Sequence, residues 1–174
     1  EESVSPEGEH IVYHYKGEDE ANVDLVGQEA QRERSALSYL FMVQYGNLTQ
    51  ETHLYAWDNS ASAQTWLFSA VFDYGERGVD PLSPPQFSPS GDWLARKAPF
   101  SLYQYGFEMR CHRLCRQVLM FHHFPDELTE ADTLVGRLLF EYDESSNISL
   151  LSQVQQWAYD IDDNPQMLPP LELT

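Results

Sequence analysis

Positive charge is scarce in this sequence. It holds 10 lysines and arginines against 28 aspartates and glutamates, which gives a formal net charge of -18. A nucleic-acid binder needs a basic patch to displace counterions, and an anionic membrane surface attracts basic segments. The composition therefore argues against both kinds of partner. It favours either a soluble, self-repelling surface or a negative field that matches a basic partner.

Long hydrophobic runs are also absent. No stretch of 18 or more apolar residues occurs, so the sequence predicts no transmembrane span. The first ten residues, EESVSPEGEH, lack the basic start and apolar centre of a signal peptide. Because the chain begins without Met, we expect a fragment or a processed product, with any export signal outside it. We expect a disordered lead-in over 1–9 and one β domain over 10–174, which is long enough to bury a core.

The common catalytic motifs are missing too. No G-x-S-x-G, G-x-x-x-x-G-K-[ST] or G-x-G-x-x-G motif occurs, which removes the nucleophile elbow and the phosphate-binding loops. Only two cysteines are present, Cys111 and Cys115. On a strand they would lie roughly 13 Å apart, too far for a disulfide, whereas on a helix they would be neighbours. We expect two buried free thiols.

The histidines do not form a convincing metal site. His122 and His123 are adjacent, so on a strand they point to opposite faces. His112 and Cys115 lie three residues apart, a spacing that suits a helix better than a strand. Cys115 lies near two arginines, which would lower the pKa of an exposed thiol. An enzyme would have to use His112, Cys115 and a carboxylate, and we favour structural roles for these residues instead.

The densest carboxylates are equally ambiguous. The run at 160–164 could offer oxygen ligands to calcium, but it lacks the Gly at position 6 and the Glu at position 12 of an EF-hand loop. A solvated acidic loop is the better interpretation. We therefore assign no catalytic, cofactor-binding or metal-binding residue.

The stretch 107–124, FEMRCHRLCRQVLMFHHF, holds both cysteines and three of the six histidines. Phe107, Cys111, Leu114, Val118 and Phe121 fall at helical spacing, so an amphipathic helix is one interpretation. The alternative is a pair of central strands with faces of opposite parity, separated by a β-bulge. The aromatic flanks without helix caps favour strands.

The remainder of the chain reads as mainly β. Alternating or strongly apolar runs predict strands at 10–15, 38–45, 52–57, 65–74, 101–105 and 134–142, and an edge strand with tandem prolines at 167–173. The segment 148–159 fits both a strand and a helix. The segment 28–34 is either a solvated helical turn or a disordered insertion, and 76–92 is a long proline-rich loop. Four tyrosines precede Gly or Asp, either as a repeat or as a common way to end a strand.

Several stretches together resemble one family, the SpvB-like region of insecticidal toxin complex B components, also found in a Salmonella virulence plasmid protein. The matching stretches are WLFSAVFDYGE (66–76), PFSLYQYGFEMRCHRLCRQVLMFHHFPDEL (99–128), LVGRLLFEYDESSNISLLSQVQQWAY (134–159) and LPPLEL (168–173), with looser matches at 13–24 and 39–47. The resemblance covers nearly the whole chain in order and corresponds to the later part of the family's region.

The resemblance implies a twisted antiparallel sheet within a larger shell, related to Rhs or Tyr-Asp repeat proteins. In that family, the shell is built with the C component and encloses a toxic polypeptide, which passes into the channel of the A component. We therefore expect a secreted, non-catalytic module without cofactors. The alternative is a stand-alone acidic interaction module that binds a protein partner. Exposed strand edges also suggest a homo-oligomer.

Overall fold

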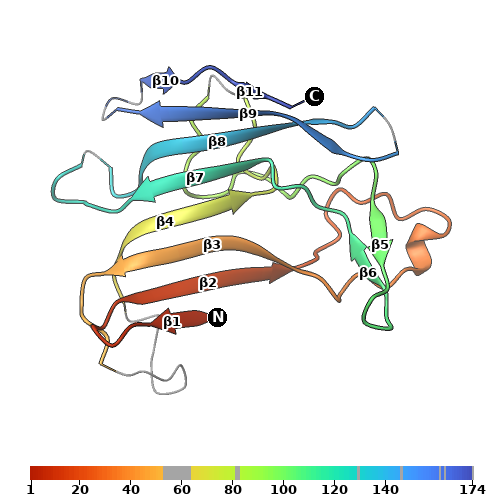
Figure 1. Ribbon diagram of the computed structural model, residues 1–174, viewed down its shortest axis with the longest axis horizontal. Helices are drawn as coiled ribbons and strands as arrows, with labels where there is room; N and C mark the ends of the chain where they lie inside the picture. The colour runs from red at the N-terminus through yellow and green to blue at the C-terminus, as the bar shows by residue number, and fades with distance from the viewer. Residues whose placement is uncertain are drawn as a thin grey trace.

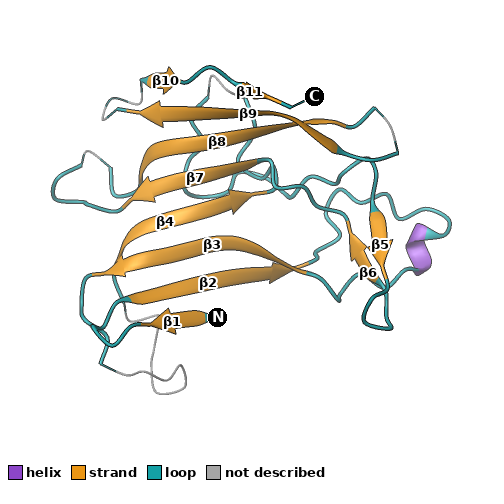
Figure 2. Cartoon of the chain, viewed as in Figure 1, coloured by secondary structure: helices purple, strands orange, loops and turns teal. Residues whose placement is uncertain are grey.

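The computed structural model describes residues 1–52, 64–80, 83–128, 130–145, 147–160, 162 and 164–173. Within these residues the chain forms one nine-stranded antiparallel sheet and a two-stranded sheet (Figure 1). The only helix among them is a single 3-10 turn, η1 (Glu29–Gln31), beside the small sheet (Figure 2). The mainly β fold is confirmed. The weak strand expected at 52–57 lies almost entirely outside the described residues.

The large sheet follows the order of the chain except for one interruption. Its strands are β1 (Glu2–Val4), β2 (His10–Gly17), β3 (Ser38–Asn47), β4 (Trp66–Asp73), β7 (Gln117–His122), β8 (Thr133–Asp143), β9 (Leu150–Tyr159), β10 (Pro165–Met167) and β11 (Leu171–Glu172). They pair in the order β1-β2-β3-β4-β7-β8-β9-β10, and β11 also pairs with β9. The interruption between β4 and β7 holds the long loop and the small sheet, β5 (Phe100–Leu102) and β6 (Met109–Cys111).

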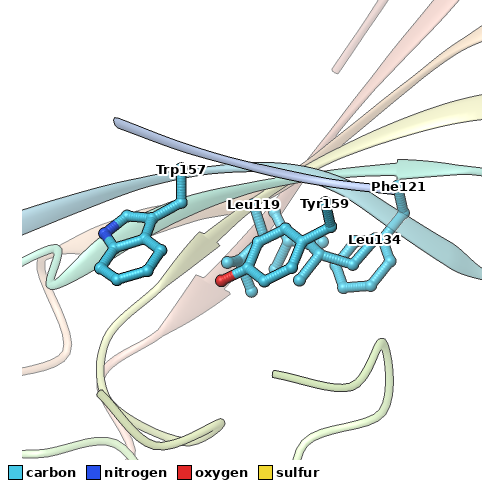
Figure 3. Close-up of a cluster of buried hydrophobic side chains, with 6 residues drawn as sticks. Leu119, Phe121, Leu134, Trp157 and Tyr159 are labelled. Carbon is cyan, nitrogen blue, oxygen red and sulfur yellow. The ribbon is translucent and has the colours of Figure 1, made fainter. Parts of the chain in front are cut away.

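One face of the large sheet carries the core. The cross-strand row His14, Met42, Val71, Leu119, Arg137 and Trp157 runs over six strands on this face. Val71, Leu119, Phe121, Leu134, Trp157 and Tyr159 form its buried cluster. The labelled side chains in Figure 3, those of Leu119, Phe121, Leu134, Trp157 and Tyr159, project from one side of the sheet, toward the loop that follows β4. We call this the covered face.

The loop after β4 closes the covered face through polar anchors as well as apolar contacts. Phe87 packs on the buried cluster, and Trp93 is 3% exposed. Gln117 Nε2 donates to the carbonyl of Gly78 at 2.7 Å, and Arg137 Nη1 donates to that of Asp80 at 3.0 Å. Buried side-chain donors thus satisfy loop carbonyls that would otherwise be desolvated without a partner.

Tyrosine-glycine pairs recur where the glycine needs positive φ: near the end of β3, after β4, and in the turn between β5 and β6. Gly46, Gly75 and Gly106 have φ of 69°, 108° and 84°. Tyr45 stacks on Phe68, with ring centroids 5.1 Å apart. A Cβ at Gly46 would lie 2.6 Å from the Phe68 ring. The Tyr-Gly pairs therefore combine an aromatic contact with a backbone turn that L side chains rarely adopt.

Two expectations need correction. Residues 1–9 are not all disordered, because Glu2–Val4 pair with β2. The stretch 107–124 is not a helix, nor is it one strand pair: β6 pairs with β5, whereas β7 lies between β4 and β8. The change of parity occurs in the irregular segment 112–116 rather than at a bulge. The segment 28–34 contains the expected helical turn, η1, which buries none of its residues, and Arg34 after it is 7% exposed.

Candidate interaction surface

The basic residues before β7 anchor a lobe at one end of the sheet. The lobe contains β5, β6, η1 and the acidic segment after β2 (Figure 2). Arg113 lies at its centre, with a side chain that is 0% exposed. Its Nε donates to both carboxylate oxygens of Glu18, at 2.9 and 3.0 Å, and its Nη1 donates to the carbonyls of Ala21 and Trp93. The Glu18 side chain is also 0% exposed.

A second carboxylate, Glu29, gathers the neighbouring basic groups. Arg110 Nη2 lies 2.7 Å from one Glu29 oxygen, and His112 Nε2 lies 3.0 Å from the other. Burial opposes ionisation of Glu29, but hydrogen bonds from Arg110 and His112 hold its pKa below the usual value. Burial lowers the pKa of His112 despite this carboxylate. Arg110 and His112 are therefore structural partners of Glu29 in η1.

The two cysteines lie in the same segment as free thiols. Burial raises the pKa of the Cys115 thiol to about 12. The nearby arginines do not offset this effect, since Arg113 is bound to Glu18 and Arg116 to Glu144. A nucleophilic cysteine needs a depressed pKa and access to substrate. Cys115 and His112 therefore do not form the reactive pair that an enzyme would need.

A hydrogen-bonded Ser-His-Asp chain exists that sequence spacing could not indicate. His123 Nε2 lies 2.8 Å from Ser69 Oγ, and His123 Nδ1 lies 2.7 Å from Asp132 Oδ1. Such an order of groups occurs in acyl-transfer enzymes. Here Ser69 is 0% exposed, in the middle of β4 on the covered face, with Phe87 stacked edge-on against His123. A substrate cannot reach this hydroxyl, so we interpret the chain as a tie between β4 and the turn after β7.

The other histidine of the pair lies on the opposite side of the sheet. His122 contacts the rings of Phe68 and Phe124, with centroids 5.0 and 5.7 Å away. His122 and His123 thus do not converge on one ion. Among the described residues, no group of three or more His, Cys, Asp or Glu side chains could hold a metal. After β9, Asp160 Oδ1 accepts hydrogen bonds from the backbone N–H and the side-chain amide of Asn164. The candidate calcium loop is therefore held by hydrogen bonds between its own residues.

The side of the sheet that carries His122 is uncharged along its central cross-strand rows. A cross-strand row on this side comprises Tyr13, Val43, Ala70, Met120, Gly136 and Ala158. A second row comprises Phe72, Val118, Leu138 and Gln156. None of these residues is buried, and none is charged. In Figure 1 this side faces the viewer, and no described segment crosses in front of its central strands. We call it the open face.

The open face contains a shallow notch over Gly136. The notch has a volume of about 260 Å³ and is lined by Val118, Met120, Leu138 and Gln156, with backbone from Arg137 and Trp157. It arises because Gly136 places no side chain between Met120 and Ala158 in the row. The lining is mainly apolar.

The geometry therefore defines a β-sheet module with an uncharged, exposed sheet face. Among the described residues, no helix has the length and hydropathy of a membrane span. The model of the SpvB family, described as Salmonella virulence plasmid 65kDa B protein, matches residues 1–124. The chain belongs to the SpvB family.

Individual relatives agree with this assignment. The chain is 62% identical over 162 residues to the Mono(ADP-ribosyl)transferase SpvB of Salmonella typhimurium strain 14028s, which covers 93% of this chain and 27% of that protein. The chain thus spans about a quarter of the length of the curated relatives it matches. The solved N-terminal domain of effector protein SpvB from strain LT2 superimposes with a TM-score of 0.87 at 62% identity, over 92% of this chain and 50% of the domain.

Toxin complexes provide the second group of matches. The crystal structure of TcdB2-TccC3 contains a region that matches 100% of this chain with a TM-score of 0.90 at 46% identity, and this region is 9% of the solved chain. A Photorhabdus luminescens Tc holotoxin pore gives a TM-score of 0.89 at 46% identity, over 100% of this chain and 8% of that chain. The similarity supports a structural module, and the match to the SpvB transferase covers only a minor part of that protein.

Proposed function

We propose that this chain is a non-catalytic structural module of a toxin-complex B-type protein. Residues 10–174 act as one SpvB-like unit that contributes β-strands to the shell around a toxic polypeptide. The observation that carries the proposal is the match of the whole chain to TcdB2-TccC3 at 46% identity. The buried ion pairs, the inaccessible Ser69 and the high pKa of Cys115 support a structural rather than catalytic role.

The partners follow from this assignment. The C component and its enclosed toxic segment would contact the module directly. The channel of the A component would be an indirect partner, because it would meet the assembled shell and not this module. A shell of this kind acts outside the producing cell, so the protein is secreted. The net charge of -18 suits a wall that must not aggregate or bind nucleic acid.

Replacement of the matching region of TcdB2 by this chain tests the proposal. The chimera should form a complex with TccC3 that elutes at the size of the native complex. A matched chimera with Arg113→Ala, which loses the partner of the buried Glu18, should assemble poorly. A folded chimera that fails to bind TccC3 would contradict the proposal.

A second candidate is a stand-alone acidic module that binds a protein partner. It is favoured by the exposed apolar residues along the β9–β11 edge, of which Met167 and Leu171 are 61% and 62% exposed. An open sheet edge can accept an added strand from a partner. Binding to a basic protein that weakens as salt is raised would support this candidate, because salt screens surface charges.

A further inference from the structure

The open face has the composition of a buried surface. In an antiparallel sheet with one side in water, outward residues are normally polar. In β7, however, Val118 and Met120 point to the open face while Leu119 and Phe121 point to the core. Both sides of the central strands are therefore apolar. Apolar patches of this breadth on a soluble protein mark interaction sites.

The area of the face suits a stable interface. The six strands β2, β3, β4, β7, β8 and β9 lie ~4.8 Å apart and share at least the six-residue length of β7, so the face measures roughly 600 Å² in projection. A stable interface buries about 800 Å² of accessible surface on each partner. Side-chain relief brings the accessible area of the face above its projected area, so the two values are comparable.

The charge distribution narrows the choice of partner. The face itself has no charged residue in the rows above, so an apolar, uncharged surface fits it better than a basic one. A second copy of this chain would bring together two molecules that each carry a net charge of -18, and repulsion between these charges opposes association. The solved SpvB N-terminal domain offers another source, since this chain matches only 50% of it. The unmatched half is of similar size and therefore large enough to cover the face.

We propose that the open face of this chain is an internal interface, covered by an apolar layer that corresponds to the half of the solved SpvB N-terminal domain that this chain does not match. A side chain of that layer fills the notch over Gly136. The proposal depends on membership of the SpvB family and not on the shell function, so either can fail without the other.

Native methionines provide the test, because peroxide oxidises a methionine in proportion to its exposure. Met120 lies on the open face, and Met42 packs against the core on the covered face. The two proteins compared are the 174-residue chain and the SpvB N-terminal domain of Salmonella typhimurium carrying this chain in place of its matching region. Met120 should oxidise several-fold more slowly in the chimera than in the isolated chain, whereas the rate of Met42 should be the same in the two proteins.

Equal Met120 rates in the two proteins would overturn the proposal. Protection of Met120 in the isolated chain, together with a dimer in sedimentation, would also overturn it, in favour of a second copy. Leu138→Glu in the chimera supplies a second measurement. Burial of the new charge should lower the melting temperature by about 5 °C or more, whereas Tyr105→Glu, on a side chain that is 64% exposed, should change it little. Equal shifts for the two variants would again contradict a covered face.

Discussion

Removal of the Arg113 side chain should be the most destabilising single change in the lobe. Arg113→Ala leaves the Glu18 carboxylate buried without its cation and removes the donor to the carbonyls of Ala21 and Trp93. Loss of one member of a buried ion pair costs about 3–5 kcal/mol. The total free energy of unfolding of a domain is about 5–15 kcal/mol, so the variant should be marginally stable.

Urea unfolding at pH 7, followed by tryptophan fluorescence and circular dichroism, measures this loss. Arg32→Ala is the matched control, because the Arg32 side chain is 30% exposed and its pairs with Glu108 and Glu29 are partly solvated. The control should lose about 1 kcal/mol or less. The double variant Arg113→Met with Glu18→Leu should recover the part of the loss that comes from the unpaired charge, but not the part that comes from the carbonyls of Ala21 and Trp93. A loss below about 1 kcal/mol for Arg113→Ala would show that Glu18 is solvated, and the reasoning would be wrong.

Four further outcomes follow from the titratable and nucleophilic groups. Burial lowers the pKa of His112, so on acidification the unfolded chain binds this proton before the folded chain does. The free energy of unfolding should therefore fall as the pH drops through about 6.5. The variant His112→Gln should flatten that part of the pH profile. The pKa of Glu29 is also lowered, so its contribution is present above the unfolded pKa of about 4.3 and should be lost as pH falls below it. Because burial raises the pKa of Cys115 to about 12, iodoacetamide at pH 8 should alkylate it far more slowly in the folded protein than in urea, as read by mass spectrometry. Ser69→Ala should cost about 1 kcal/mol of stability, and a fluorophosphonate probe should leave wild-type Ser69 unlabelled; labelling would restore the enzymatic interpretation.

Local sequence was sufficient to predict most of the large sheet. The runs that became β2, β3, β4 and β8 have strong β propensity, and Gly46 and Gly75, both with positive φ, lie close to the ends of β3 and β4. The segment 148–159, which fitted a helix as well, became β9 because its residues pair with β8 along most of their length. Tertiary pairing decided between two patterns that were equal in periodicity.

The segment 107–124 shows where sequence reasoning stops. Arg110 and Arg113 interrupt the apolar alternation, and each is buried against a carboxylate. These carboxylates, Glu29 and Glu18, lie 81 and 95 residues away in the chain. No local pattern reveals such partners. In β7 both faces are apolar, so alternation could not indicate which side the loop after β4 would cover. In the Ser69–His123–Asp132 chain, likewise, one hydrogen bond joins Ser69 to His123, which lies 54 positions later.

Protection of a toxic polypeptide tests the central claim most directly. The measurement is proteolysis of the hypervariable C-terminal region of TccC3 in a complex whose TcdB2 carries this chain in place of its matching region. If the module completes the wall of the shell, that region should survive at protease concentrations that digest it rapidly when it is free. Digestion at the same rate inside and outside an assembled complex would show that this chain does not close the shell.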